Sequence, residues 1–286
     1  MNPVIYSRRY RFADGLALSL GERTLIMGIL NVTPDSFSDG GQYDSIEAAV
    51  RRAAQMAEEG ADLIDIGGES TRPGHEPVTA EEEQRRILPV IEAVRREVRL
   101  PISVDTYRAE TAERALAAGA HLLNDIWGLK HDPRMAGVAA EYGVPVILMH
   151  NRQRRDYQDF VPDVLRDLQE SVALAQTAGI ADDRIWLDPG IGFAKDYEDN
   201  LELMGRLDEL NKLGYPVLLA TSRKTFIRRT LDLPADDVVE GTGATTALGI
   251  AQGCQIVRVH DVRAAKRAAT MTDAIVYRQA KLGSDR

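Results

Sequence analysis

Polar side chains follow each of eight apolar segments in this sequence, and several are of the types that bind anions. Two of them, Arg258 and His260, lie two positions apart on one predicted strand, so their side chains point to the same face. A planar guanidinium and an imidazole directed at one spot suit a phosphate or a diphosphate. The full set is Asn31, Glu69, Ser70, Thr71, Arg72, Asp105, Thr106, Asn124, Asp125, His150, Asp188, Ser222, Arg223, Lys224, Arg258, His260 and Asp261.

Other members of this set offer charge and hydrogen-bond acceptors around such an anion. Lys224 and Arg72 add positive charge, and the Asn31 amide could orient a Mg²⁺ bound to a diphosphate, because Mg²⁺ takes few protein ligands. A buried carboxylate is costly unless it is paired, so a ligand rich in N–H donors, such as an aminopyrimidine edge, is its natural partner. The acceptors expected deeper in the site are Asp105, Asn124 and Asp188.

A structural explanation competes with the chemical one, because Asp, Asn, Ser and Thr also cap helices. It fits Thr106 and Asp261 well. It fits the cations Arg258, His260 and Lys224 poorly, since a cation at a helix N-terminus opposes the helix dipole unless an anion lies between them. We interpret the remaining histidines as packed or surface residues. They are His75, His121, His131 and His150.

The elements that must position these residues alternate along the chain. Apolar segments with strand character occupy residues 24–29, 63–66, 102–104, 122–126, 144–149, 185–187, 217–219 and 256–259. Amphipathic segments with helical spacing occupy residues 44–59, 79–98, 108–118, 163–178, 197–213 and 262–279, with Asp44 and a Thr79–Glu82 capping box as N-terminal signals. Glycines precede the strands where helices must end. Eight alternating units predict an α/β fold, a (β/α)8 TIM barrel.

The predicted domain organisation is a single domain over residues 1–286. The barrel covers about 24–280, and a short N-terminal β-hairpin over about 10–20, with Asp14-Gly15 as its turn, closes the bottom. Residues 30–41 form an unusually long connection between the first strand and its helix. Because this segment is polar apart from Phe37, we expect it to be a lid over a polar ligand.

Composition excludes several classes of function. The chain has 286 residues, is 44% hydrophobic and carries a formal net charge of -9, with no basic run that resembles a nucleic-acid footprint. Cys254 is the only cysteine, so an intrachain disulfide and a cysteine-based metal site are excluded. No apolar run approaches the ~18 residues of a membrane span, and residues 1–11 lack a signal-peptide core. We expect a cytoplasmic protein without nucleic-acid or membrane partners.

Seven motifs, in order along the chain, resemble those of the dihydropteroate synthase family. They are LNVTPDSFSDGG at 30–41, GGESTRPG at 67–74, SVDT at 103–106, NDI at 124–126, LDPGIGF at 187–193, SRK at 222–224 and RVHDV at 258–262. The resemblance covers about residues 24–275. It implies a pterin-binding TIM barrel that condenses 6-hydroxymethyl-7,8-dihydropterin diphosphate with p-aminobenzoate, releases pyrophosphate and forms dihydropteroate for folate synthesis.

The resemblance also assigns roles to residues, with Asp188 facing the aminopyrimidine edge. The pterin diphosphate site it implies is Thr71, Asp105, Asn124, Ile126, Met149, Asp188, Phe193, Lys224, Arg258 and His260. The implied p-aminobenzoate site is Phe37, Arg72, Pro73 and Thr225. The implied catalytic residues are Asn31, Asp35, Arg72, Lys224, Arg258 and His260, with Asn31 as a Mg²⁺ ligand. A homodimer and sulfonamide sensitivity are implied as well.

The mechanism we expect begins with cleavage of the carbon–oxygen bond. Arg258, His260 and Mg²⁺ stabilise the leaving diphosphate, and the arylamine then attacks a cationic methylene. A protein nucleophile and a strong general base are not required, because an arylamine is neutral near pH 7. Departures from the family pattern are Ala220 where Gly is frequent, Thr225 where Ser is common, and a 151–155 segment without the usual Gly and Pro.

Three alternatives remain open from the sequence. A methyltetrahydrofolate-dependent methyltransferase would share the barrel and the pterin carboxylates but has no use for the Arg258/His260 pair. A Schiff-base aldolase is suggested by Lys224 at a strand end, although anion binding explains its neighbour Arg223 more easily. A non-catalytic pterin-binding paralogue would lack the intact lid and anion residues.

Overall fold

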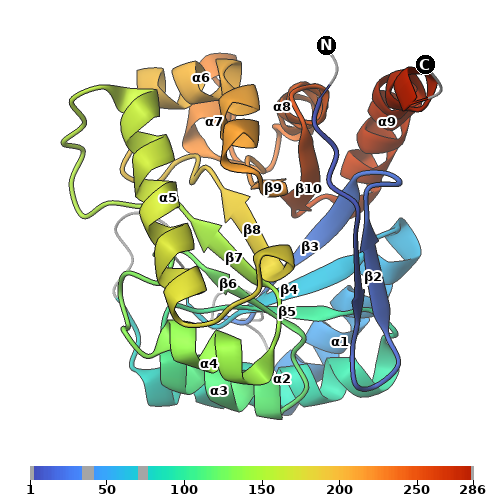
Figure 1. The fold of residues 1–286 in the computed structure, drawn as a ribbon. Coiled ribbons are helices and arrows are strands. Elements are labelled where there is room, and N and C mark those ends of the chain that lie inside the picture. The colour runs from blue at the N-terminus through green and yellow to red at the C-terminus, as the bar shows by residue number, and fades with distance from the viewer. Residues whose placement is uncertain (1–2, 34–41, 70–76, 285–286) are drawn as a thin grey trace.

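The computed structural model describes residues 3–33, 42–69 and 77–284. Within these ranges eight parallel strands form a closed barrel in the order β10-β3-β4-β5-β6-β7-β8-β9, which confirms the predicted (β/α)8 fold (Figure 1). The strands are β3 (Leu25–Asn31), β4 (Leu63–Gly67), β5 (Ile102–Asp105), β6 (Leu122–Asp125), β7 (Val146–Met149), β8 (Ile185–Asp188), β9 (Val217–Leu219) and β10 (Cys254–Val259).

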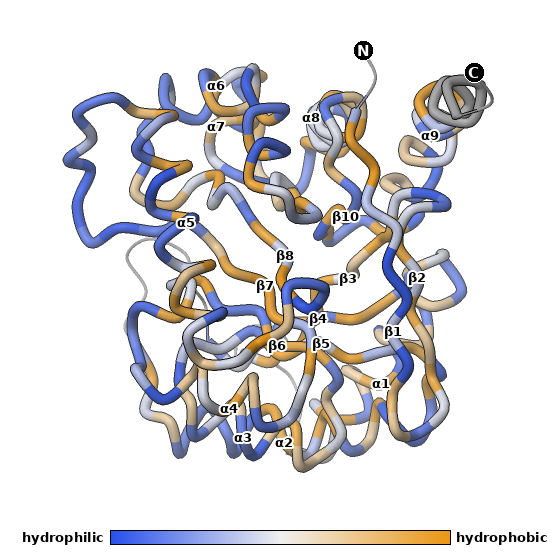
Figure 2. The backbone as a smooth tube through the Cα atoms, in the orientation of Figure 1, coloured by the Kyte–Doolittle hydropathy of each residue, from blue (hydrophilic) through white to orange (hydrophobic). Residues whose placement is uncertain are grey.

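Helices cover the outside of the barrel, and the strands at its centre are the hydrophobic part of the chain (Figures 1 and 2). The α-helices are α1 (Gln42–Glu59), α2 (Ala80–Glu97), α3 (Ala109–Ala117), α4 (Met135–Tyr142), α5 (Phe160–Thr177), α6 (Tyr197–Gly205), α7 (Thr225–Leu231), α8 (Val239–Ala251) and α9 (Val262–Ser284). Sequence periodicity missed α4, α7 and α8. The predicted helix over 197–213 is divided into α6 and a 3-10 helix, η3 (Leu207–Leu213), while η2 (Asp182–Arg184) precedes β8.

A short antiparallel hairpin closes one end of the barrel, as predicted. Its strands are β1 (Arg8–Arg11) and β2 (Ala17–Leu20), which pair from Arg8 with Leu20 to Arg11 with Ala17. Gly15 has a φ of +86° in the connecting turn. Tyr10, Leu18 and Leu20 are buried in one apolar cluster with Leu25 and Leu63, which begin β3 and β4. The hairpin therefore seals the amino-terminal ends of the strands.

Two local predictions at helix starts need correction. Helix α1 begins at Gln42, so Asp44 lies within the helix rather than capping it. At α2 the Thr79 side chain accepts a hydrogen bond from the Glu82 amide, as the capping box requires. The Glu82 carboxylate accepts from Arg85 and Arg86, one turn further along the helix, rather than from the Thr79 amide. Only the Thr79 half of the capping box therefore forms.

The glycines expected at helix ends adopt the backbone conformation that this position requires. Each of them has a positive φ, between +60° and +109°, where a side chain would be strained. They are Gly60, Gly119, Gly143, Gly179, Gly214 and Gly253.

Candidate active site

A cavity of about 620 Å³ opens at the carboxyl-terminal ends of the strands, the place where barrels of this kind carry their chemistry. It brings together eleven of the residues singled out from the sequence, although they span more than 200 positions of the chain. They are Asn31, Asp105, Asn124, Ile126, Met149, Asp188, Phe193, Lys224, Thr225, Arg258 and His260. Six further candidates lie outside the described residues: Asp35, Phe37, Ser70, Thr71, Arg72 and Pro73.

The floor of the cavity is an ion cluster around Arg258. Its Nε lies 2.6 Å from Asp65 Oδ2 and its Nη2 lies 2.7 Å from Asp105 Oδ2. Asp65 is fully buried in the middle of β4. Arg258 was predicted to face an anion together with His260. Two of its three nitrogens contact carboxylates, and Nη1 has no hydrogen-bond partner among the described residues, so the prediction now concerns Nη1.

The carboxylates of this cluster retain unused acceptors. Asn124 donates from Nδ2 to Asp65 Oδ2 over 3.1 Å, yet Asp65 Oδ1 and Asp105 Oδ1 are buried and have no hydrogen-bond partner among the described residues. Burial raises the pKa of Asp105 to about 7, against the opposing effect of the Arg258 charge. A buried acceptor without a donor is unfavourable, and Asp105, which lines the cavity, therefore suits a ligand that brings N–H groups.

Asp188 and Lys224 form the second polar side of the cavity. Asp188 is buried and accepts a hydrogen bond from the Gly190 amide over 2.7 Å, and Lys224 Nζ donates to the Ile191 carbonyl. Burial raises the pKa of Asp188 and lowers the pKa of Lys224 to about 8, while the attraction between the two charges opposes both shifts. A polar ligand that reaches both groups would replace the water that burial has removed.

An apolar wall stands beside these charges. Ile126 and Met149 form a small buried cluster with Tyr107, and the ring of Phe193 packs against it. Lys224 Nζ lies 4.8 Å from the centre of the Phe193 ring. A flat ring with a polar edge fits between this wall and the acceptors.

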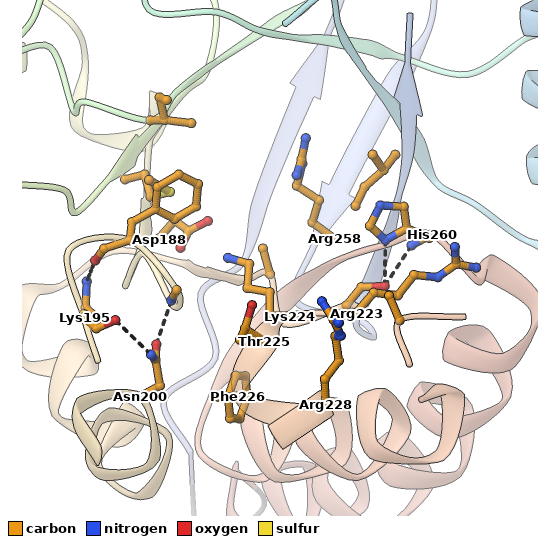
Figure 3. Close-up of a pocket in the computed structure, with 18 of the residues that line it drawn as sticks. Asp188, Lys195, Asn200, Arg223, Lys224, Thr225, Phe226, Arg228, Arg258 and His260 are labelled. Atoms are coloured by element: carbon orange, nitrogen blue, oxygen red, sulfur yellow. Dashed lines mark hydrogen bonds between the residues drawn. The ribbon is translucent and has the colours of Figure 1, made fainter. Parts of the chain in front are cut away.

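The rim of the cavity carries His260 and three further arginines, Arg223, Arg228 and Arg229. Ser222 Oγ lies 2.9 Å from His260 Nδ1 and accepts from the His260 amide over 3.1 Å, which fixes the imidazole at the end of β10 (Figure 3). Arg223, which the sequence suggested as an anion-binding group, instead pairs with Asp261 through contacts of 3.1 and 2.8 Å. Arg229 stacks over Tyr197 at 4.1 Å.

Three residues of the site were missed by sequence reasoning: Asp65, Lys195 and Asn200. Asp65 is the only charged residue within an apolar segment. Because residues two apart on a strand share a face, its position after the buried Leu63 indicated that its carboxylate faces inward. Lys195 follows the 187–193 motif by two positions and carried no pattern of its own. Both Lys195 and Asn200 line the cavity (Figure 3).

His121, His131 and His150 have structural contacts, as expected, whereas His75 lies outside the described residues. His121 Nδ1 accepts from the Ile102 amide over 3.0 Å. The buried His150 lies with Nε2 3.0 Å from Asp167 Oδ2 and Nδ1 2.8 Å from Lys195 Nζ. In the described part of the chain, His, Cys, Asp and Glu side chains form no group of three that could hold a metal ion. In the same part, no helix is long and apolar enough to cross a membrane.

The fold and cavity define a class of protein: a (β/α)8-barrel enzyme whose site binds a flat, N–H-rich ring next to an anionic group. Residues 27–260 match the family model described as pterin binding enzyme. The chain is 60% identical over 260 residues to a dihydropteroate synthase of Bacillus subtilis, covering 91% of both chains.

Solved structures give the same result. A Xanthomonas albilineans dihydropteroate synthase with 4-aminobenzoic acid is 44% identical, with a TM-score of 0.89 and coverage of 94% of this chain and 98% of that one. A structure of the enzyme from the same organism in complex with 7,8-dihydropteroate is 43% identical, with a TM-score of 0.84 and coverage of 92% and 97%. This chain belongs to the pterin-binding enzymes and, within them, to the dihydropteroate synthase family.

Proposed function

We propose that this chain acts as a dihydropteroate synthase, a transferase that joins 6-hydroxymethyl-7,8-dihydropterin diphosphate to p-aminobenzoate with release of pyrophosphate. The observation that carries the proposal is the cavity floor, where buried acceptors with unused oxygens lie beside an apolar wall and below a cationic rim. Solved structures of its relatives support the proposal. One contains 4-aminobenzoic acid, which is the arylamine substrate, and another contains the product, 7,8-dihydropteroate.

The pterin half of the substrate would occupy the floor. The N–H groups of its aminopyrimidine edge suit Asp188 and the unused oxygen of Asp105, and Asn124 contributes an amide beside them. Ile126, Met149 and Phe193 would cover the faces of the ring. The Lys224 ammonium is placed to reach the ring's carbonyl oxygen or N5, since it lies against Phe193 and near Asp188.

The diphosphate would occupy the rim. His260, Arg258 Nη1 and the Asn31 amide line the same cavity and are donors of the kind that bind phosphate oxygens. Thr71, which the family resemblance adds to this group, lies outside the described residues.

A Mg²⁺ ion fits this donor set as a companion of the diphosphate. Beside the donors assigned to the diphosphate, the protein offers the side-chain oxygen of Asn31, and the described His, Cys, Asp and Glu side chains form no group of three that could hold a metal ion. Mg²⁺ commonly binds in this way, through substrate phosphates, waters and one or two protein oxygens. When bound, it would neutralise charge on the departing diphosphate.

The reaction we propose breaks the bond between the methylene carbon and the diphosphate oxygen before the new bond forms. The electron pair of that bond leaves with the diphosphate, where Arg258, His260 and Lys224 stabilise the added charge. The electron-rich dihydropterin supports the cationic methylene, and the arylamine lone pair then forms the carbon–nitrogen bond. The amine proton passes to solvent or to the released pyrophosphate, so no protein nucleophile is needed.

p-Aminobenzoate would enter from the mouth of the cavity. Thr225, at the start of α7, lines the mouth and offers a hydroxyl to the carboxylate. Phe37, Arg72 and Pro73 complete this site in our proposal but lie outside the described residues, as do residues 34–41 of the lid predicted over residues 30–41.

We also propose a homodimer that uses helices α8 and α9. These helices pack against each other and expose Leu248, Met271 and Ile275, with exposed fractions of 43%, 63% and 54%. Exposed apolar side chains of this size suit a twofold interface. The cytoplasmic location and the lack of nucleic-acid partners stay predictions from composition.

The test is dihydropteroate formation by the purified chain, followed by chromatography. We expect product only when the pterin diphosphate, p-aminobenzoate and Mg²⁺ are all present, and loss of product when EDTA removes the metal. A sulfonamide should compete with p-aminobenzoate and not with the pterin. Tight pterin binding without product would instead indicate a non-catalytic paralogue.

A further inference from the structure

Lys195 is a half-buried cation of the cavity wall to which the proposed chemistry gives no role. Its Nζ lies 2.8 Å from His150 Nδ1, 3.0 Å from the Gly190 carbonyl oxygen and 3.0 Å from the Phe193 carbonyl oxygen. An ammonium has three N–H donors, and here each one has an acceptor. A neutral amine has two N–H groups and would leave one of these acceptors without a donor.

The acceptor role of His150 is fixed by its other nitrogen. His150 Nε2 lies 3.0 Å from Asp167 Oδ2, and the Asp167 carboxylate also accepts from Arg152 Nε over 2.6 Å. Because an ionised carboxylate can only accept, Nε2 carries the proton and Nδ1 of the neutral ring is free to accept from Lys195. Burial lowers the pKa of His150 to about 4, so the ring stays neutral at physiological pH. Helix α5 is thereby connected to the loop after β8.

The loop that Lys195 holds carries two residues of the pterin site. The Gly190 and Phe193 carbonyls lie on either side of Ile191 and Gly192, and Asp188 and Phe193 stand at the ends of this turn. Gly190 has a φ of +67°, and a Cβ there would lie 1.9 Å from the His150 carbonyl oxygen, so the turn packs directly on the end of β7. Asn200 secures the same turn by accepting from the Gly192 amide over 2.6 Å (Figure 3).

We propose that Lys195 is a positioning residue for the pterin half of the site: its three hydrogen bonds fix the loop after β8 so that Asp188 and Phe193 hold the ring in the orientation for reaction. This inference rests on the proposed function, because it concerns the binding of the pterin substrate. Lys195 itself touches the loop and His150, and acts on the substrate through them.

The positioning should depend on pH. Burial lowers the pKa of Lys195 to about 7, helped by Lys224 and opposed by the negative charges of Asp188, Asp199 and Asp167. The three carboxylates belong to the end of β8, to α6 and to α5, and His150 with Arg152 faces Lys195 from the end of β7. As pH rises through about 7, the ammonium loses a donor and the loop loses one of its three attachments. The KM for the pterin diphosphate should therefore rise.

The experiment compares Lys195→Met and Lys195→Gln with the unchanged chain. At about pH 6.5 we expect Lys195→Met to raise the KM for the pterin diphosphate about tenfold and the KM for p-aminobenzoate less than about twofold. Lys195→Gln keeps two N–H donors without charge, so it should match the unchanged chain above pH 8. Both variants should lose the rise of KM near pH 7. Lys224 loses its proton near pH 8 in the unchanged chain and in both variants, so its effect on KM cancels when the three proteins are compared.

The matched control is Lys212→Met, which removes a lysine whose exposed ammonium pairs with Glu209 at 3.3 Å. It should leave both KM values and their pH profiles unchanged. An unchanged pterin KM in both Lys195 variants, or an equal loss for both substrates, would overturn the inference. If the unchanged chain itself neither forms dihydropteroate nor binds a pterin by calorimetry, the proposed function fails instead, so the two failures are distinguishable.

Discussion

The two ends of the barrel interior are built from the same strands but filled with opposite chemistry. A step of two residues along a strand changes the inward-facing side chain from apolar to polar: Leu63 to Asp65 on β4 and Leu122 to Asn124 on β6. The same step leads from Trp186 to Asp188 on β8 and from Ile256 to Arg258 on β10. The lower layer belongs to the cluster closed by the hairpin, and the upper layer is the cavity floor.

The difference lies in how far each layer satisfies its polar groups. In the lower layer Trp186 Nε1 donates to Tyr10 Oη over 2.8 Å, and Tyr10 Oη donates to the Asp183 carbonyl over 2.7 Å, so both groups are paired. In the upper layer two carboxylate oxygens have no partner among the described residues. The Trp186–Tyr10 pair of the lower layer needs no further partner, whereas the carboxylates of the upper layer keep two unused acceptors. Substitutions should therefore affect stability below and activity above.

The largest effect should come from Arg258, where the comparison is sharpest. Arg258→Met should lower turnover about 100- to 1,000-fold, because it removes a charge next to the leaving diphosphate. It should also lower the free energy of unfolding by about 3–5 kcal/mol, because Asp65 and Asp105 lose their partner in a buried place. Steady-state kinetics and urea unfolding measure the two effects.

Arg223→Met is the matched control, since this arginine lines the same cavity but pairs with the partly exposed Asp261. Equal effects of the two substitutions would contradict the special place of Arg258. Because Arg258 also contacts Asp105, weaker pterin binding should accompany the loss of turnover.

Asp188→Asn should come next in size. Replacing the carboxylate by an amide removes one acceptor oxygen facing the aminopyrimidine edge, so we expect the pterin KM to rise about 10- to 100-fold. The free energy of unfolding should change little, because the amide oxygen still accepts from the Gly190 amide. Calorimetric titration with a product pterin checks this, and an unchanged affinity would remove Asp188 from the pterin site.

Tyr10→Phe should give the reverse pattern at the lower end. It leaves the Trp186 N–H and the Asp183 carbonyl without a partner, which should lower the free energy of unfolding by about 1–3 kcal/mol. Both KM values should stay within about twofold of the unchanged chain. A large rise in KM would mean that the two layers are coupled and that the comparison fails.

A smaller effect should appear in how the free energy of unfolding responds to acid, because the histidines at the two ends of the barrel differ in their surroundings. His150, at the upper end, has its pKa lowered to about 4 by burial, while the unfolded chain binds this proton near 6.5. The unfolded state then holds more protons between these values, so stability is complete above about pH 6.5 and falls as pH drops toward 4, by at most ~1.4 kcal/mol per pH unit.

Urea unfolding at several pH values between 7 and 4.5 tests this for His150→Gln, with His121→Gln as the control at the lower end. Burial also lowers the pKa of His121, but Asp14 favours its charged form. We therefore expect His150→Gln to remove more of the acid sensitivity than His121→Gln does. The opposite order would contradict the assigned environments.

The sequence was sufficient for the barrel because each strand is an apolar segment that ends in a polar residue. It failed for α8, where Gly241, Gly243 and Gly249 weaken the helical pattern, and for α7, which has only seven residues. Motif residues such as Asp188 and Arg258 were found by position. The pairing of Arg258 with Asp65 and Asp105 was not predicted, because these contacts join residues 193 and 153 positions apart.

The most direct test of the central claim is pyrophosphate release by the purified chain from the dihydropterin diphosphate and Mg²⁺, measured with and without p-aminobenzoate. If the upper layer binds the pterin and stabilises the leaving diphosphate, release should be fast, should depend on p-aminobenzoate and should match the dihydropteroate formed. No release under either condition, while the chain remains folded and binds a pterin, would contradict the account.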